Sequence, residues 1–288
     1  MLAQLLALSA AFTLAVGVVL TRKEINKDNF FSFIIILTII GNILVWPLII
    51  VFPPKGLNME ALTIFIIVGF LHPGFARILY FLGMTKVGAS INASIFAIYP
   101  LISTLFAMFI LNEQPTTLIW LGIFFVIIGS IFIQNSIHKR ESMHRSVSVP
   151  SLLAMIIAGF AYTLKKMGVS LCKEPLLATA ITYLISLIIY LSIVSFSQSV
   201  RNNLQIDVNT FKLFWKGSVC LAIGAIIPFY ALMYGNVSTV TPLLQTEPLF
   251  ILLFSYIFLK AIERISKGVV IGTFMIVTGV ILITFLST

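Results

Sequence analysis

The sequence predicts an all-α integral membrane protein with ten transmembrane helices, arranged as two inverted repeats of five helices each. Three observations support this prediction: the composition, the length of the apolar runs, and residues that recur at a fixed spacing. Hydrophobic residues make up 60% of the 288 residues and charged residues only 9%, and the mean hydropathy is +1.12. A soluble domain has about 25% charged residues, because polar groups must cover its core. The composition therefore excludes a soluble globular fold.

Ten apolar runs are long enough to cross a bilayer as helices. About 20 residues are needed, because a helix rises about 1.5 Å per residue and the hydrocarbon layer is about 30 Å thick. The runs must be helical, since lipid offers an exposed backbone no hydrogen-bond partner. In chain order they lie at residues 2–20, 32–52, 61–82, 89–111, 117–136, 151–171, 176–196, 217–235, 239–259 and 268–286. We expect the first run to be a retained helix and not a signal peptide, because no basic residue precedes it.

A polar, basic linker at residues 138–150 divides the ten runs into two groups of five. The sequence thus predicts a first five-helix repeat over residues 1–137 and a second over residues 151–288. The net charge of +9 lies mainly in loops, where it orients a membrane protein, so it does not indicate nucleic-acid binding. Thirteen of the 18 Lys and Arg residues follow odd-numbered runs and four lie on the opposite side. By the positive-inside rule both termini then lie outside the cytoplasm.

The same Tyr, Glu, Gly and Pro residues recur in both halves at a nearly constant spacing. The members of four pairs are 150 positions apart, and those of a fifth pair, Pro100 and Pro248, are 148 apart; the four are Tyr80 and Tyr230, Glu113 and Glu263, Gly122 and Gly272, and Gly129 and Gly279. Because each half has an odd number of spans, the second half enters the membrane with opposite polarity. Such inverted repeats place a binding site between the halves near mid-membrane and serve alternating access.

The repeated residues resemble the signature of EamA-type transporters of the drug/metabolite transporter superfamily. The first copy is Pro100, Leu111-Asn112-Glu113, Gly122 and Gly129, and the second is Tyr230, Glu247-Pro248, Glu263, Gly272 and Gly279. The second copy departs from the pattern at Lys260-Ala261-Ile262, where the first has the compact Leu-Asn-Glu. The resemblance implies ten helices, a central cavity, and export or exchange of small metabolites. It also implies cytoplasmic termini, so the side of the membrane that the termini face stays open.

Other repeated residues have a structural interpretation. Gly122 and Gly129 are seven positions apart and so lie on nearly the same helix face, where small residues let two helices approach closely in lipid. Gly272 and Gly279 repeat this spacing. Glu113 and Glu263 follow the ends of spans, where carboxylates cap helices or hold loops.

Charged groups inside the spans indicate the substrate site, because charge at membrane depth is costly. Arg77 lies in the third span and Glu247 in the ninth. His72 precedes Pro73-Gly74, which breaks the third helix, and broken helices are tolerated where they line a cavity. His72 and Arg77 are about 140° apart on an ideal helix. We therefore favour Arg77 over His72 as the cavity residue.

The sequence predicts a polar cavity lined by the third, fourth, eighth and ninth spans. Arg77 would bind an anionic group such as a carboxylate, and Glu247 a cationic amine or a proton. Paired kinks are expected where Tyr99 precedes Pro100 and Glu247 precedes Pro248. The remaining candidate substrate-binding residues on these spans are Tyr80, Asn92, Tyr230 and Gln245.

Two structural alternatives stay open for these charges. Arg77 and Glu247 would form a salt bridge that only holds the halves together, or Arg77 would reach the membrane interface with its long side chain. Lys165 and Lys166 are interpreted as reaching the interface in that second way.

These features predict a secondary transporter in the plasma or inner membrane. It would move small metabolites, such as amino acids or similar amphiphilic compounds, by alternating access in the direction of export. The chain lacks a G-x-x-x-x-G-K-[ST] run for ATP, and its two Cys and three His are too few and too scattered for a metal site, so no cofactor or metal is expected. Proton coupling through His72 or Glu247 is left open.

Two alternative functions are also weighed. An antiporter for phosphorylated or nucleotide-linked sugars would need several basic residues converging on phosphate, and only Arg77 is clearly inside a span. A membrane-embedded enzyme or a structural membrane protein is the alternative outside transport. The oligomeric state is not predicted.

Overall fold

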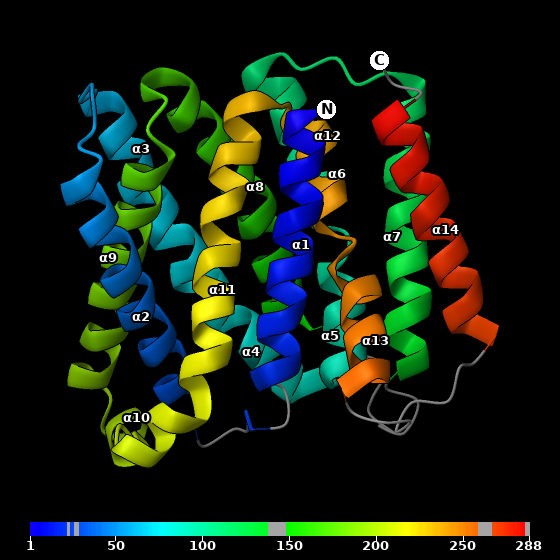
Figure 1. The fold of residues 1–288 in the computed structure, drawn as a ribbon. Coiled ribbons are helices and arrows are strands. Elements are labelled where there is room, and N and C mark those ends of the chain that lie inside the picture. Colours follow the sequence, from blue (N-terminus) through cyan, green and yellow to red (C-terminus); the bar gives the residue numbers. More distant parts are fainter. Residues whose placement is uncertain (22–23, 26–28, 138–147, 259–266, 286–288) are drawn as a thin grey trace.

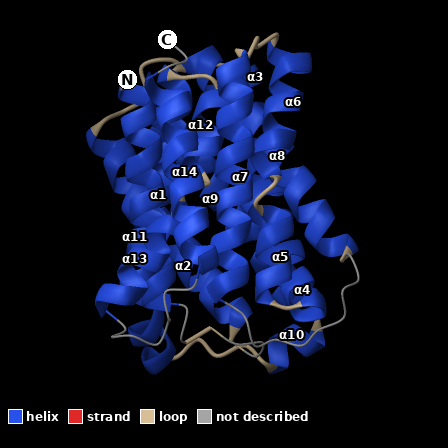
Figure 2. Cartoon of the chain, turned by 90° about the vertical axis from the view of Figure 1, so that its right-hand side faces the viewer, coloured by secondary structure: helices blue, strands red, loops and turns tan. Residues whose placement is uncertain are grey.

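The computed structural model describes residues 1–21, 24–25, 29–137, 148–258 and 267–285, and within these ranges every regular element is a helix. The helices stand side by side in one bundle (Figures 1 and 2). In chain order they are α1 (Leu2–Thr21), α2 (Phe30–Val51), α3 (Met59–Gly69), the π-helical η1 (Phe70–Phe75), α4 (Ala76–Val87), α5 (Ala89–Phe96), α6 (Tyr99–Leu111), α7 (Thr117–Ile137), α8 (Val149–Cys172), α9 (Pro175–Phe196), α10 (Gln198–Asn202), α11 (Val208–Tyr234), α12 (Val237–Leu244), α13 (Glu247–Phe258) and α14 (Lys267–Phe285).

Ten helical segments within the described residues are long and apolar enough to cross a membrane. They coincide with the ten predicted runs to within a few residues, except that the eighth begins at Val208 instead of residue 217. Asp207 extends this helix toward the loop, because its carboxylate accepts a 2.8 Å hydrogen bond from the backbone N–H of Thr210 and caps the first turn. The prediction of an all-α, multi-pass membrane protein is confirmed.

The third span is broken in its middle, as Pro73 predicts. His72 has extended backbone angles, φ −147° and ψ 114°, between the helical segments on either side. Helix α9 supplies hydrogen bonds to the carbonyl groups around the break. The Tyr190 hydroxyl donates to the Pro73 carbonyl oxygen at 2.7 Å, and Ser186 Oγ donates to the Gly69 carbonyl oxygen at 3.0 Å. A broken helix at this depth is stable because its backbone is satisfied by a neighbouring helix.

The fourth and ninth spans are also broken, each into two half-helices. Helix α5 is followed by α6, which begins at Tyr99, and α12 is followed by α13, which begins at Glu247. Pro100 and Pro248 come next, in the first turn of each second half-helix, where proline costs no intrahelical hydrogen bond. The predicted paired kinks are therefore present.

The repeated glycines join α7 to α14 at close range. A Cβ atom on Gly129 would lie 2.6 Å from the Gly272 carbonyl oxygen, and one on Gly279 would lie 2.7 Å from that of Gly122. Gly122 thus faces Gly279 while Gly129 faces Gly272, which requires the two helices to run antiparallel. This packing matches the seven-residue spacing and the need for small residues between helices in lipid.

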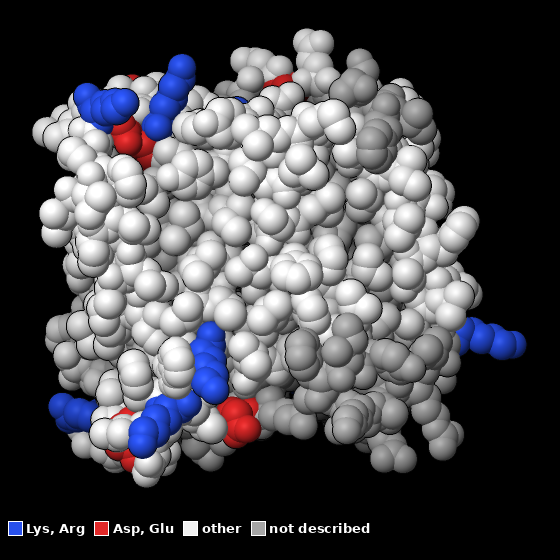
Figure 3. Space-filling model, viewed as in Figure 1, with Lys and Arg blue, Asp and Glu red and all other residues white. Residues whose placement is uncertain are grey.

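The bundle has two ends with different features. Charged side chains gather toward both ends on the face in Figure 3, with an uncharged band between them. The start of α1 and the end of α14 lie at one end of the bundle, which we call the terminal side; the opposite end, where α7 ends and α8 begins, is the linker side (Figure 1). Helix α1 runs from the terminal to the linker side and α8 runs the other way (Figure 1). An origin of the halves by duplication stays a prediction, with which these opposed directions agree.

The half-helices pack unequally at the two ends. On the terminal side α6 packs against α12, where the side-chain oxygens of Ser103 and Thr241 lie 2.7 Å apart. The Tyr99 hydroxyl donates to the Thr241 carbonyl oxygen at 3.3 Å. On the linker side the described residues of α5 and α13 make at most marginal contact. The bundle is therefore closed between these half-helices at its terminal side and looser at its linker side.

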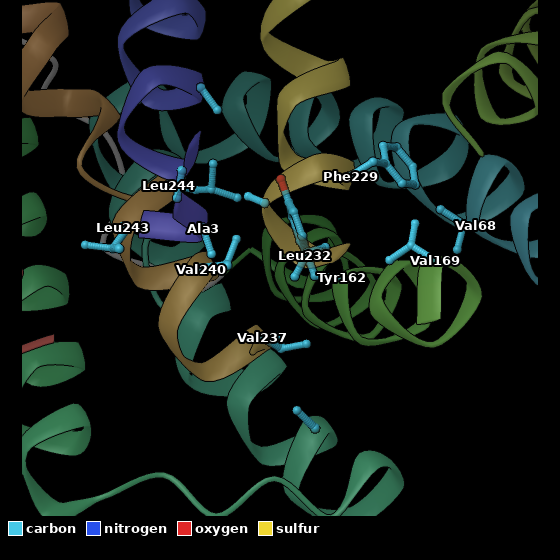
Figure 4. Packing of buried hydrophobic residues seen from close by; sticks show 14 of the residues in the cluster. Ala3, Val68, Tyr162, Val169, Phe229, Leu232, Val237, Val240, Leu243 and Leu244 are labelled. Atoms are coloured by element: carbon cyan, nitrogen blue, oxygen red, sulfur yellow. The ribbon is translucent and has the colours of Figure 1, made fainter. Parts of the chain in front are cut away.

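A buried hydrophobic cluster crosses from one half of the chain to the other. It joins Ala3 of α1 and Val68 of α3 to residues of α8, α11 and α12 (Figure 4). Tyr162 of α8 and Phe229 of α11 belong to this cluster, and their rings also border the polar site in the middle of the bundle. Apolar packing thus holds helices of both halves around that site.

Candidate functional site

A cavity of about 30 Å³ lies between helices of both halves. Helices η1 and α4 come from the first half, and α8, α9 and α11 from the second. Its lining residues are His72, Pro73, Arg77, Lys165, Thr179, Thr182, Tyr183, Ala225 and Phe229. A cavity of this size holds about two water molecules. In this conformation it fits one polar group and not a whole metabolite.

Three basic side chains converge on the cavity. Lys165 is only 5% exposed, and its Nζ lies 3.4 Å from Nδ1 of His72. The same ammonium lies over the rings of Tyr162 and Phe229, 4.3 and 5.1 Å from their centroids, where cation–π attraction stabilises it. The buried Nη1 of Arg77 has no hydrogen-bond partner among the described residues.

The broken third span brings His72 and Arg77 to the same cavity. On an ideal helix they would point about 140° apart, so the choice of Arg77 over His72 assumed a helix that continues. The extended backbone at His72 interrupts the helical rotation between them. On its other side Arg77 lies close enough to Tyr190 to interact electrostatically with its hydroxyl group. Both residues therefore line the site.

The prediction that both lysines of the sixth span reach the membrane interface is wrong for Lys165. It lies one turn beyond Tyr162 on the buried face of α8, and His72 and two aromatic rings surround its ammonium. Lys166, one position on, is half-buried and donates to the Leu232 carbonyl oxygen at 2.9 Å. The spacing of Lys165 from Tyr162 and from Val169 was the available signal, since residues three and four apart share a helix face.

Aromatic rings connect the cavity to the break in the fourth span. The rings of Tyr162 and Tyr99 are stacked, with centroids 5.4 Å apart and an interplanar angle of 22°. Phe96 continues the series beside Tyr99, and Tyr80 meets Phe96 edge to face at 5.0 Å. Glu247 lies close enough to Tyr80, Tyr99 and Tyr162 to interact with them electrostatically. The basic cavity and Glu247 thus border the same column of rings.

The described residues include no ion pair between Arg77 and Glu247, and the buried Nη1 of Arg77 does not reach the interface. Neither of the two structural alternatives for Arg77 describes this conformation. A purely bridging role would require the guanidinium and the carboxylate to meet, and no such pair is present among the described residues. Their roles in substrate binding stay predictions.

The other predicted residues are spread over a wider region. Asn92 is buried and its Oδ1 accepts a 2.6 Å hydrogen bond from Ser151 Oγ. Gln245 is buried at the break of the ninth span, where its carbonyl oxygen accepts from Ser130 Oγ at 3.0 Å. Tyr230 lies near Glu174 and Tyr234, away from the cavity lining. Their substrate contacts also stay predictions.

The cavity lining differs from the predicted set of spans. The third and eighth spans line it as predicted, but the sixth and seventh take the places expected for the fourth and ninth. Thr179, Thr182 and Tyr183 form a polar face on α9 at helical spacing, and this face was the missed signal. The fourth and ninth spans contribute the aromatic column and Glu247 instead.

Glu113 caps a helix of the other half. Its carboxylate oxygens accept hydrogen bonds from the backbone N–H groups of Val237 and Ser238, at 2.7 and 3.0 Å. These groups begin α12, where a negative charge is favourable. The predicted capping role of Glu113 is confirmed, and the contact adds to the closure of the terminal side. Its counterpart Glu263, with Lys260-Ala261-Ile262, lies outside the described residues, as do positions 138–147 of the linker.

Within the described ranges no group of three or more His, Cys, Asp or Glu side chains is arranged to hold a metal. A model of the EamA-like transporter family matches residues 1–134 and 149–285. A solved structure titled "Crystal structure of protein" is similar over 99% of this chain and 96% of its own, with a TM-score of 0.74 and 17% identity. That likeness concerns the fold alone. No curated protein matches the chain.

Proposed function

Because the chain belongs to the EamA-like transporter family, we propose that it is a secondary transporter working by alternating access. It moves small metabolites, such as amino acids or similar amphiphilic compounds, in the direction of export. The observation that carries this proposal is the basic cavity between helices of both halves, continued by aromatic rings toward Glu247. Arg77 binds the anionic group of the substrate and Glu247 a cationic amine or a proton. The family assignment favours transport over an embedded enzyme or a structural protein.

Unequal packing of the half-helices supports alternating access. In an inverted repeat α12 corresponds to α5 and α13 to α6, so the contact of α6 with α12 corresponds to one between α13 and α5. The first contact is made here, and the second is at most marginal in the part of these helices that the structure describes. Exchanging the conformations of the halves would close the linker side and open the terminal side. The substrate would then meet the cavity from each side in turn.

Locking α6 to α12 is therefore expected to stop transport. The side-chain oxygens of Ser103 and Thr241 lie 2.7 Å apart, so Ser103→Cys with Thr241→Cys brings two sulfur atoms within reach of a disulfide. In a background with Cys172 and Cys220 replaced by Ser, oxidation should reduce flux in proteoliposomes to that of empty vesicles. Reduction should restore flux.

The single variants Ser103→Cys and Thr241→Cys serve as matched controls, and oxidant should leave their flux unchanged. Mass spectrometry of the reconstituted protein gives the cross-linked fraction. Undiminished flux from fully cross-linked protein would show that the terminal side need not open, and alternating access between these half-helices would be wrong.

Proton coupling through Glu247 forms part of the proposal. Gln has nearly the same shape as Glu but does not bind or release a proton. An imposed pH gradient should accelerate net flux by the wild-type protein and leave that of Glu247→Gln unchanged, while the variant retains substrate exchange at equal pH. Wild-type flux that ignores the gradient would exclude coupling, and a gradient response retained by Glu247→Gln would contradict the role of this carboxylate.

Antiport of phosphorylated or nucleotide-linked sugars is the second candidate function. The convergence of Arg77, Lys165 and His72 favours it, because phosphate recognition needs several basic groups at one place. Counterflow distinguishes the candidates. Vesicles preloaded with an unlabelled amino acid or with a sugar phosphate are offered the labelled compound, and only a transported class gives transient accumulation.

A further inference from the structure

We propose that the cavity between η1, α4, α8, α9 and α11 is an oxyanion site, at which Arg77 and Lys165 together bind a carboxylate or phosphate group. His72 positions the Lys165 ammonium. This inference rests on the proposed function and deepens it, because it names organic anions as the substrate class. It also adds Lys165 and His72 to the groups that recognise the substrate.

The charge balance of the lining favours an anion. Arg77 carries a fixed positive charge, protonated Lys165 adds a second, and the described lining contains no carboxylate. Two buried like charges repel each other, and each loses hydration that only an opposite charge or hydrogen bonds replace. Glu247 lies beside the tyrosine rings and forms no ion pair with either cation among the described residues. A bound anion would supply the missing countercharge.

The hydroxyl groups of the lining already donate hydrogen bonds within the bundle. Thr179 Oγ1 donates to the Pro175 carbonyl oxygen and Thr182 Oγ1 to that of Thr179, both at 2.8 Å. The Tyr183 hydroxyl donates to the Ala222 carbonyl oxygen at 3.4 Å. These three hydroxyls therefore have their protons engaged in the bundle. The unpaired Nη1 of Arg77 and the ammonium of Lys165 suit a ligand made of acceptors, such as a carboxylate or phosphate.

The contact between Lys165 and His72 sets the direction of the ammonium. An ammonium group has only donors, so at 3.4 Å it uses one N–H toward Nδ1 of His72, which acts as acceptor. The rings of Tyr162 and Phe229 cover other sides of the ammonium. The remaining N–H groups are available to a ligand in the cavity. His72 is thus a positioning residue, while Arg77 and Lys165 make the contact.

The size of the cavity limits what it takes in this conformation. About 30 Å³ accommodates a single small group, so the rest of the substrate must extend elsewhere. The stacked rings of Tyr162 and Tyr99 lead away from Lys165 toward Glu247 and provide an apolar surface. A substrate with an oxyanion at one end and an apolar body fits this arrangement.

Binding to the purified full-length protein in nanodiscs tests the site. The probes are benzoate, phenyl phosphate, inorganic phosphate and, as a cation of similar size, benzylamine, measured by calorimetry and by thermal shift. We expect at least one oxyanion to bind and raise the melting temperature, and benzylamine not to. Benzoate binding alone identifies a carboxylate site, phenyl phosphate binding alone an organic phosphate site, and inorganic phosphate binding a site for the free ion as well.

The variants identify the residues that bind. Lys165→Met and Arg77→Gln should each raise the Kd of the bound oxyanion at least tenfold, whereas Lys165→Arg should retain part of the affinity. Lys166→Met, which removes the same charge one position along, should leave the Kd unchanged. Equal affinity in Lys165→Met and wild type, or no oxyanion binding by the wild-type protein, would overturn the proposal. If Lys165→Met does not fold, Lys165→Gln and the probe selectivity of the wild type decide.

Flux measured on the same preparations separates this proposal from transport itself. If the protein binds an oxyanion but transports no compound, the proposed oxyanion site stands and the proposed transport function is wrong. If the protein transports a neutral or cationic compound but binds no oxyanion, the proposed transport function stands and the proposed oxyanion site is wrong.

Discussion

Replacing Arg77 with Gln is expected to reduce substrate flux by at least about 100-fold. A hydrogen bond to a charged group contributes about 1.5–3 kcal/mol, so losing two of them weakens binding by a factor of this order. The Nη1 of Arg77 lies buried in the cavity region with no other partner among the described residues, so Gln removes donors that the substrate would use. Initial rates in proteoliposomes, normalised to the amount of inserted protein, measure the effect.

Stability separates this role from a structural one. A buried guanidinium that lacks a countercharge is costly, so Arg77→Gln should leave the melting temperature unchanged or raise it. Arg77→Lys retains the charge without the planar fork and should transport at an intermediate rate. Wild-type flux by Arg77→Gln would end the assignment. A large fall in its melting temperature would indicate that Arg77 mainly holds the bundle together.

Substituting Gly129 is expected to have the largest effect on the fold. A Cβ atom there would lie 2.6 Å from the Gly272 carbonyl oxygen, which is backbone and cannot turn aside. Overpacking of this kind costs about 1–3 kcal/mol, and Gly129→Val adds further atoms at the same contact. We expect Gly129→Ala to lower the melting temperature and Gly129→Val to abolish the monodisperse folded protein. Fluorescence-detected size exclusion and thermal unfolding measure both.

Two further variants make this test specific. A Cβ atom added at Gly56 would have no neighbouring atom within 4 Å, so Gly56→Ala and Gly56→Val should behave as wild type. Gly272→Ala makes the reciprocal 2.6 Å contact and should match Gly129→Ala, while the double variant should cost less than the sum, because the first substitution already separates the helices. A Gly129→Ala protein with the wild-type melting temperature would contradict the need for this close approach.

The candidate site was predictable in part. Arg77, His72 and Glu247 stand out because charge or a titratable ring is rare at membrane depth. Lys165 has the same property, but its position two turns from the helix end favoured the interpretation that it reaches the membrane interface. The polar face of Thr179, Thr182 and Tyr183 is common in membrane helices, where such hydroxyls bond to their own backbone. Nothing in their spacing shows which neighbour they face.

The order of the spans followed from the sequence by itself, because lipid forces every apolar run of sufficient length into a helix. The sequence also predicts the helix breaks at Pro73, Pro100 and Pro248, because proline lacks a backbone N–H. It predicts the close contacts at the glycines, because glycine lacks a Cβ atom. Only the tertiary structure decided which polar groups meet. A break such as that at His72 resets the rotation of the following helix, and the partner of each helix face depends on packing between residues far apart in the chain. For that reason Lys165 reaches His72 across 93 positions, whereas Arg77 and Glu247 do not meet.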